Sequence, residues 1–317
     1  MIAWSPSNPV VPLIRVDALR LIGLQLETSS APGWRMRKQV DKHIANGQHA
    51  SLAKALDGAA IKEYRYAART LHAALRDRDG ELMNYVVTSS SKPDKSTRLL
   101  TCELLPFAYG RDQARSLSIL EALVEDEDWS IRDAASETCG RIFRSNFSPM
   151  LGVLEMWRAS KSANVRRAVV LASMRAASPR HLERAEPLLK LLEPLLEDRE
   201  PLVRRNLGPS ALGTVLLQHY PSAAFEYLVK WSTSNDPQVL WNVAMAFSCK
   251  PAATIAKKAL IVLRKLSLDE RRFVWRAVAS AMWKLGRKAP ELIRPELARW
   301  LEDERRVNVA REALKHL

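Results

Sequence analysis

The sequence predicts an all-α protein, built as a right-handed α-solenoid of about eight or nine helical pairs. A short phrase returns about every 35 residues, and successive copies start 33, 34, 34, 38, 36, 35 and 33 positions apart. Apolar residues within each copy lie at helical spacing, whereas β-branched runs are short. This period is typical of stacked helical repeats, because a single helical pair cannot bury its apolar face alone.

The second helix of each pair is expected to begin close to the recurring phrase. Acidic or turn-forming residues come just before several copies, as in residues 128–131, 200–203 and 236–239, and such residues favour a helix start. The eight copies begin at Tyr64, Thr97, Ile131, Val165, Val203, Val239, Val274 and Val307.

The first helix of a pair is clearest in the fifth copy, where an apolar stripe precedes the turn at residues 197–201. The stripe consists of Leu188, Leu189, Leu191, Leu192 and Leu195. Three prolines predict that residues 1–30 form an irregular lead-in with a possible degenerate first helix, and residues 34–37 resemble a degenerate phrase. The chain is therefore expected to be one HEAT-like solenoid over residues 1–317, although its length alone would suggest two domains.

The composition narrows the class of partner. Lys and Arg number 49 against 35 Asp and Glu, which gives a formal net charge of +14. Such an excess favours a polyanionic partner, because cationic side chains on one face attract phosphates regardless of base sequence. Nucleic acid is the first expectation, and an acidic protein or a membrane surface are the alternatives.

Other functional classes are disfavoured. Cys102, Cys139 and Cys249 are far apart in the sequence, which argues against a disulfide framework and fits a reducing cytoplasm. No Cys/His cluster has ligand spacing, so no metal is expected. The absence of a Walker loop and of a dinucleotide-binding glycine pattern predicts no cofactor. The N-terminus resembles neither a signal peptide nor a membrane span.

Alignment of the copies separates structural from functional positions. Eight residues before the phrase, leucine alternates with tryptophan, so Trp157 and Trp231 are expected in the core. The second residue of the phrase is arginine in five copies. HEAT repeats use such an arginine to pair with turn aspartates of neighbouring repeats, and we expect this ladder here for Arg65, Arg98, Arg132, Arg166 and Arg204.

The third position of the phrase is the candidate contact surface. It holds Asp133, Arg167, Arg205, Trp241 and Arg276, together with Tyr66, Leu99 and Val309. The inner surface of a solenoid is an extended binding groove. Arginine suits phosphate oxygens, and tryptophan suits the face of a sugar or base. A solvated charged edge without function is the alternative.

Trp129 is the sharpest single candidate. It lies two residues before its phrase, in a turn position that elsewhere holds lysine, alanine, proline or arginine. We expect it to be exposed and hence a candidate contact. Asp133 follows one helical turn later, which places the indole and the carboxylate on the same side of the helix.

These features resemble the bacterial DNA alkylation-repair family of HEAT-like repeat proteins, of the AlkD and AlkC type. The motifs that carry the resemblance are Trp129-x-x-x-Asp133 and residues 164–171, NVRRAVVL. The resemblance implies that Trp129, Asp133 and Arg167 match the family's cleft tryptophan, aspartate and arginine. The family's second cleft aromatic is expected near residues 208–210, which read Gly-Pro-Ser, so Trp241 is the candidate replacement.

The resemblance also implies a chemistry. Enzymes of this type cut the N-glycosidic bond of purines alkylated at N3 or N7. Asp133 would stabilise the positive sugar and Trp129 would contact it, while Arg167 would hold the adjacent phosphate. Arg205, Trp241 and Arg276 would extend the contact with DNA. Neither a metal nor a cofactor is required.

Three functions remain open: a DNA glycosylase, a non-catalytic binder of branched or distorted DNA, and a HEAT protein-interaction scaffold. Intramolecular ion pairs at Arg167, Arg205 and Arg276 would favour the scaffold. The expected partner is double-stranded DNA and no membrane. A monomer in the cytoplasm is expected, associated with the nucleoid when bound to DNA.

Overall fold

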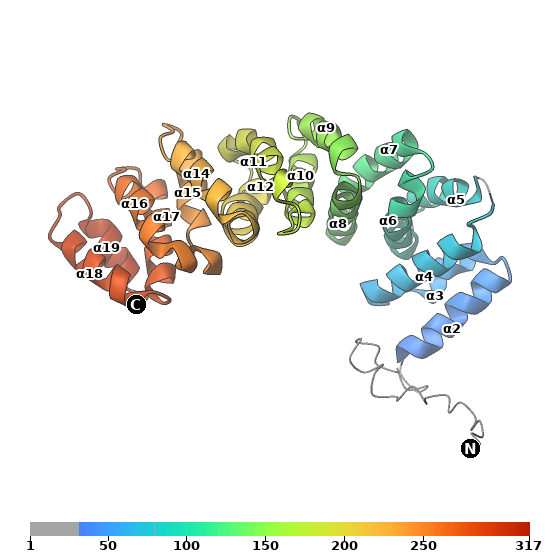
Figure 1. Cartoon of the computed structure of the whole chain (residues 1–317). Coiled ribbons are helices and arrows are strands. Elements are labelled where there is room, and N and C mark those ends of the chain that lie inside the picture. The colour runs from blue at the N-terminus through green and yellow to red at the C-terminus, as the bar shows by residue number, and fades with distance from the viewer. Residues whose placement is uncertain (1–31, 79) are drawn as a thin grey trace, which may run out of the picture. The chain divides into compact units, whose positions relative to one another are not determined.

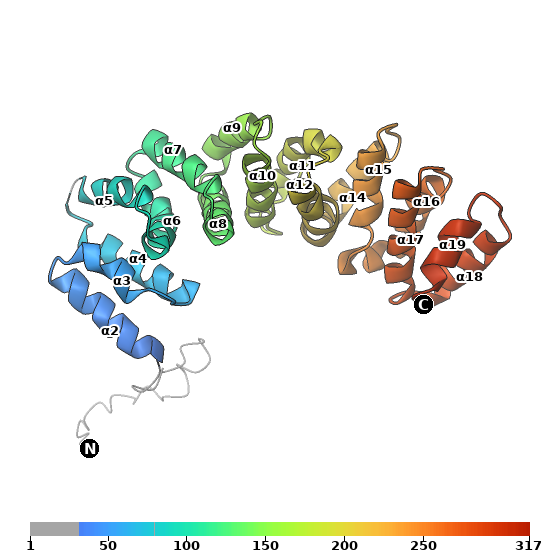
Figure 2. The same cartoon turned by 180° about the vertical axis from the view of Figure 1, so that it is seen from behind.

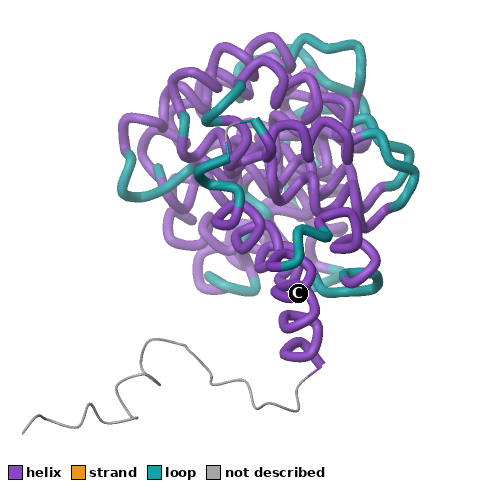
Figure 3. The backbone as a smooth tube through the Cα atoms, turned by 90° about the vertical axis from the view of Figure 1, so that its right-hand side faces the viewer, coloured by secondary structure: helices purple, strands orange, loops and turns teal. Residues whose placement is uncertain are grey.

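The computed structural model describes residues 32–78 and 80–317, and helices joined by short loops account for its architecture. Figure 3 shows no strand among these residues. The prediction of an all-α helical-repeat protein is therefore confirmed. The predicted irregular lead-in of residues 1–30 lies outside the described residues.

Contacts divide the chain into two compact units, one ending at Ala74 and the other running from Leu75 to Leu317. The helices of the first unit are α2 (Pro32–Ala45), η1 (His49–Ser51), α3 (Leu52–Ala55) and α4 (Ile61–Ala74). Helices α2 and α4 are joined by Arg37 Nε, which lies 2.9 Å from Glu63 Oε2. The single solenoid domain predicted over residues 1–317 stays a prediction.

The second unit consists of helical pairs. The first helices are α5 (Glu81–Ser90), α7 (Gln113–Val124), α9 (Phe147–Trp157), α11 (Ala185–Leu192), α14 (Pro221–Trp231), α16 (Ala256–Leu266) and α18 (Pro290–Leu301). The second helices are α6 (Lys95–Tyr109), α8 (Trp129–Ser145), α10 (Ala163–Ala176), α12 (Pro201–Asn206), α15 (Pro237–Ala246), α17 (Arg272–Gly286) and α19 (Val307–Leu314). Together with α4, every second helix begins within three residues of its predicted phrase.

Within Leu75–Leu317 the pairs follow an arc. Figures 1 and 2 show α7, α9 and α11 on its convex edge and α6, α8, α10 and α12 on its concave side. A buried apolar column, eight residues before five of the phrases, packs between the helical pairs. Its members are Leu123, Trp157, Leu195, Trp231 and Leu266, and each is at most 6% exposed.

The repeat that contains α12 departs from regular helix. After Asn206 the chain continues as a π-helix, η4 (Leu207–Leu216), and then as α13 (Leu217–His219). Pro209 has no N–H to donate to the carbonyl one turn back, which explains why the α-helical pattern ends there. The hydroxyl of Thr214 donates to the carbonyl of Pro209 at 2.9 Å, across this wider turn. Short helices η2 (Leu182–Arg184), η3 (Glu193–Glu197) and η5 (Lys250–Ile255) complete the unit.

Candidate functional site

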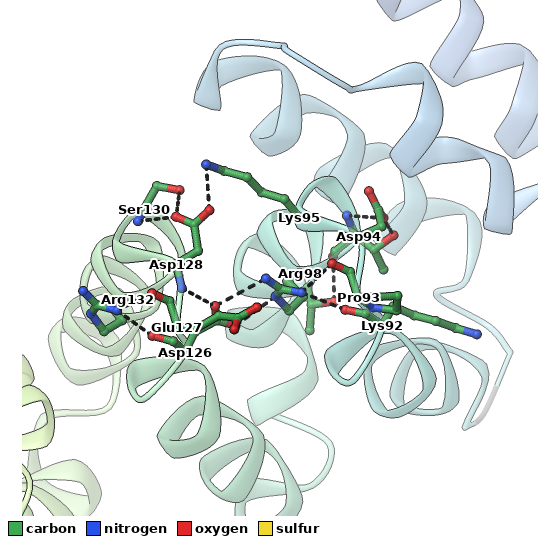
Figure 4. A network of polar contacts seen from close by, with 12 residues as sticks. Lys92, Pro93, Asp94, Lys95, Arg98, Asp126, Glu127, Asp128, Ser130 and Arg132 are labelled. Carbon is green, nitrogen blue, oxygen red and sulfur yellow. Dashed lines mark hydrogen bonds and ion pairs between the residues drawn. The ribbon is translucent and has the colours of Figure 1, made fainter.

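The first turn of α8 is fixed by hydrogen bonds made by Asp128. One of its carboxylate oxygens accepts from the backbone N–H and the hydroxyl of Ser130, at 2.8 and 2.7 Å. The other oxygen lies 2.9 Å from Nζ of Lys95 on α6 (Figure 4). The bond from the Ser130 hydroxyl, followed by that from Lys95, holds the pKa of Asp128 well below its usual range. The cap therefore stays ionised and stabilises the helix start at which Trp129 is placed.

Trp129 was predicted to be exposed, and Trp157 and Trp231 to be buried. It is 67% exposed, whereas Trp157 is 6% and Trp231 4% exposed. These values confirm the three predictions. A large apolar side chain held in solvent at a well-capped helix start has little packing role, so Trp129 remains the leading candidate for a contact with a partner.

Asp133 and Arg167 form an ion pair between neighbouring second helices. Arg167 Nη2 on α10 lies 2.5 Å from Asp133 Oδ1 on α8. The Asp133 side chain is 46% exposed and that of Arg167 is 17% exposed. The two residues that the sequence analysis assigned to the sugar and the phosphate are thus brought together at the surface, one turn beyond Trp129.

The predicted arginine ladder is present in part. Arg98 Nε lies 2.8 Å from Asp126 Oδ2, and Arg166 Nε lies 2.6 Å from Asp198 Oδ2 in the next repeat (Figure 4 shows the first pair). The hydrogen bond with Asp198 raises the pKa of Arg166. In both repeats the aspartate lies five residues before the next phrase, in the turn between the two helices.

Two ladder positions differ from the prediction. Arg132 donates to the carbonyls of Asp126 and Glu127, at 2.7 and 2.8 Å, in the turn of its own repeat. Arg204 makes no ion pair among the described residues. The reason lies in the next repeats, where Ser160 and Ser234 occupy the position that holds aspartate elsewhere.

Arg204 lies instead against two aromatic rings. Its guanidinium carbon is 5.8 Å from the ring centroid of Trp241 on α15 and 5.6 Å from that of Phe273 on α17. The two rings are stacked, with centroids 5.7 Å apart and planes inclined by 11°. Trp241 is half-buried, and Phe273 is 38% exposed. The contacts of Arg204 and Phe273 in this cluster were not predicted. The signal in the sequence was Ser234, which stands where an aspartate would pair with Arg204.

The remaining candidates of the contact column differ in their partners. Arg205 is exposed and makes no ion pair within the described part of the chain. Arg276 Nη2 lies 3.4 Å from Glu312 Oε1, and its side chain is 53% exposed. The column prediction is wrong at Val309, which is 1% exposed because the last repeat packs it inward.

A close approach of η4 to α15 explains why residue 208 carries no aromatic side chain. A Cβ at Gly208 would lie 2.9 Å from both the backbone oxygen and Oδ1 of Asn242. Asn242 is fully buried, and its Nδ2 donates to the carbonyl of Leu196 at 2.9 Å. Any side chain at residue 208 would displace α15, so Trp241, the residue before Asn242, stays the candidate replacement for that aromatic.

The described residues contain no group of three His, Cys, Asp or Glu side chains that could hold a metal ion. Cys102 and Cys139 are free and buried, and burial raises the pKa of Cys139 to about 12. No helix in the described ranges is long and apolar enough to cross a membrane.

The sequence and the fold were compared with known proteins. The profile of a family described as DNA alkylation repair enzyme matches residues 35–210, more than half of the 317-residue chain. The matched range includes Trp129, Asp133, Arg167 and Arg205. No curated protein has significant sequence similarity to the chain.

Two solved structures are similar in fold: smu.31 from Streptococcus mutans UA159 and AlkD2 from Streptococcus mutans. Each is 16% identical to this chain, with a TM-score of 0.51. Each alignment covers 65% of this chain and 97% of the other. At this identity the likeness establishes the fold of the aligned part.

Proposed function

The chain belongs to the DNA alkylation repair enzyme family, and from that premise we propose that it binds double-stranded DNA and excises cationic N3- or N7-alkylated purines. The observation that carries the proposal is that Trp129 and Asp133 lie one helical turn apart on α8 and are both exposed. The indole is 67% exposed, and the carboxylate one helical turn later belongs to a side chain that is 46% exposed. A flat apolar ring beside an accessible negative charge suits a sugar that becomes positive.

The reaction follows from the charge of the lesion. Alkylation leaves the purine cationic, so it departs with the electron pair of the N-glycosidic bond and becomes neutral. The sugar then carries positive charge at C1′ and O4′, until water adds to C1′ and loses a proton. In the proposal, Asp133 stabilises that positive charge and orients the water, while Trp129 lies against the deoxyribose.

Arg167 has a place in this scheme because its present partner is Asp133. The Asp133 side chain is 46% exposed, so exchanging the partner of Arg167 costs less than breaking a fully buried ion pair. A DNA phosphate offers Arg167 two oxygens and a full negative charge. Binding of the backbone by Arg167 would release Asp133, which makes the carboxylate available only when DNA is in place.

The test is release of N7-methylguanine and N3-methyladenine from methylated duplex DNA. Asp133→Asn should slow release by roughly 10²–10³-fold, the loss typical of one electrostatic stabiliser, with folding and DNA affinity nearly intact. The matched control is Glu137→Gln, one turn further along α8. The Glu137 carboxylate lies 3.2 Å from Arg175 Nε and is 38% exposed, so its burial and pairing resemble those of Asp133. The control should retain the wild-type rate.

Equal rates for the wild type and Asp133→Asn would remove Asp133 from the chemistry. If the wild type binds duplex DNA and releases no base, a non-catalytic binder of branched or distorted DNA replaces the glycosylase. The observation that favours this second function is Gly208, whose contact with Asn242 leaves no room for the family's second cleft aromatic. Of the three arginines whose ion pairs would favour the scaffold function, Arg167 and Arg276 are paired and Arg205 is exposed without an ion pair in the described structure. The scaffold therefore stays an alternative, and absence of binding to any DNA would favour it.

A further inference from the structure

The cluster of Arg204, Trp241 and Phe273 lies on α12, α15 and α17, outside the Trp129–Asp133 site on α8. The ladder arginines Arg98 and Arg166 are neutralised by aspartates, whereas Ser234 leaves Arg204 without one. Its guanidinium makes no hydrogen bond within the described residues. The guanidinium and the two ring centroids are mutually 5.6–5.8 Å apart, so the rings hold the arginine in place while its donors stay unused.

The surroundings of the cluster are positively charged. Arg205 follows Arg204 on α12, and Arg272 precedes Phe273 on α17; both are exposed, and neither makes an ion pair in the described part of the chain. Among the acidic residues beside α17, Asp269 pairs with Arg271 at 2.5 Å, whereas Glu270 is exposed. Three cations, Arg204, Arg205 and Arg272, therefore stand against two exposed acids without an ion pair among the described residues, Glu270 and the α12 cap Glu200.

Resting on the proposed binding of DNA, we propose that this cluster is a site for one unpaired nucleotide, whose base stacks on Phe273 and whose phosphate binds Arg204. The ring of Phe273 is stacked on Trp241 on one side and is 38% exposed. A base inside a duplex has both faces covered by its neighbours. Only a base that has left the stack can offer its face to an aromatic ring. Because every base has a flat face, stacking of this kind does not depend on the base sequence.

The test compares the affinity for an intact duplex with that for the same duplex carrying one bulged nucleotide. Fluorescence anisotropy should show that the wild type prefers the bulged duplex by about tenfold, the size of one base–aromatic stack. Phe273→Leu keeps apolar volume but has no ring face, so it should fold and lose the preference. Phe273→Trp should keep it. Arg204→Gln should weaken binding of the bulged duplex more than that of the intact one.

Leu202→Ala is the matched control. Leu202 occupies the same position of its repeat as Phe273, immediately before the phrase, and is 45% exposed. It has no ring to stack, so the preference should remain. With 2-aminopurine as the bulged base, binding to the wild type should quench its fluorescence, and binding to Phe273→Leu should not.

Any of three results would overturn the inference. They are equal affinity of the wild type for both duplexes, a loss of affinity for both duplexes by the same factor in Phe273→Leu, and an effect of Leu202→Ala equal to that of Phe273→Leu. In each case, intact duplex binding and base release remain measurable, so the proposed function stands or falls separately. Absence of binding to any DNA would overturn both.

Discussion

Replacing Gly208 by alanine should destabilise the protein, even though alanine is the better helix former. The added Cβ would lie 2.9 Å from two oxygens of Asn242 and 3.0 Å from its Cα. These atoms cannot yield easily, because two belong to the backbone of α15 and Asn242 is held by its bond to Leu196.

The size of the effect is the difference of two terms. Overpacking of this kind costs about 1–3 kcal/mol, and alanine in place of glycine returns about 0.5–1 kcal/mol in a helix. The net loss is on the order of 1–2 kcal/mol, which corresponds to a fall in Tm of about 2–8 °C for a domain of this size.

Urea unfolding followed by circular dichroism, together with a thermal melt, measures this loss. Gly152→Ala on α9 is the control, because a Cβ there meets nothing within 4 Å. It should gain about 0.5–1 kcal/mol. If Gly208→Ala is as stable as the wild type, or gains stability as Gly152→Ala does, the close approach to Asn242 is not a constraint. The explanation for the missing aromatic then fails.

Three further predictions concern other parts of the molecule. Arg205→Ala should weaken duplex binding and reduce the slope of log K against log salt by about one unit, as for a lost phosphate contact. Lys257→Ala on α16 is the control and should change neither. Equal slopes for the wild type and both variants would exclude Arg205 from the interface. Trp157→Ala should lower the free energy of unfolding by about 3–5 kcal/mol. Trp129→Ala should leave the free energy of unfolding nearly unchanged and should slow base release. A large loss of stability in Trp129→Ala would contradict the exposure of this side chain. Arg264 holds the pKa of buried Glu296 below its ordinary value of 4.5, so this pair stabilises the protein above that pH and the contribution is lost as pH falls through the lowered pKa. Glu296→Gln should therefore cost about 1–3 kcal/mol at pH 7 and progressively less below pH 4.5, with exposed Glu291→Gln as the control; a cost that does not depend on pH would exclude the charge as its cause.

Burial was predictable wherever it follows the repeat. Trp157, Trp231 and the leucines of their column share a repeat position, and one position has one environment when identical units stack. The same alignment identified Trp129 as exposed, because its position elsewhere holds polar or turn-forming residues. The helix starts followed from the acidic and proline residues before each phrase.

Partners across repeats were less predictable. Asp133 and Arg167 are 34 residues apart, and each alone fits an ordinary helix. The place of Arg204 depends on three distant residues at once: the absent carboxylate at Ser234, and the rings of Trp241 and Phe273. Pro209 marks the end of the α-helical pattern in the sequence, whereas the approach of Gly208 to Asn242 joins residues in different repeats and is not visible in a local reading.

The glycine contacts between η4 and α15 have a mechanical consequence. Gly208 and Gly213 of η4 lie so close to the backbone of α15 that a Cβ at either residue would clash with it. This close contact forms one edge of the joint between the two repeats. At the opposite edge, where α12 and α15 begin, the ladder pair is missing and Arg204 rests on aromatic rings. One exposed pair, Arg199 with Asp236 at 3.1 Å, spans that edge.

A cation on a ring face can slide without breaking a hydrogen bond, and an exposed pair resists separation weakly. The joint is therefore held by backbone contact at the glycines and, at the edge that carries Arg204, by cation–π contacts and one exposed ion pair. The joints with Arg98–Asp126 and Arg166–Asp198 are closed at this edge by ion pairs of low exposure instead. Two of the candidate contact residues, Arg205 and Trp241, lie at the joint without such a pair.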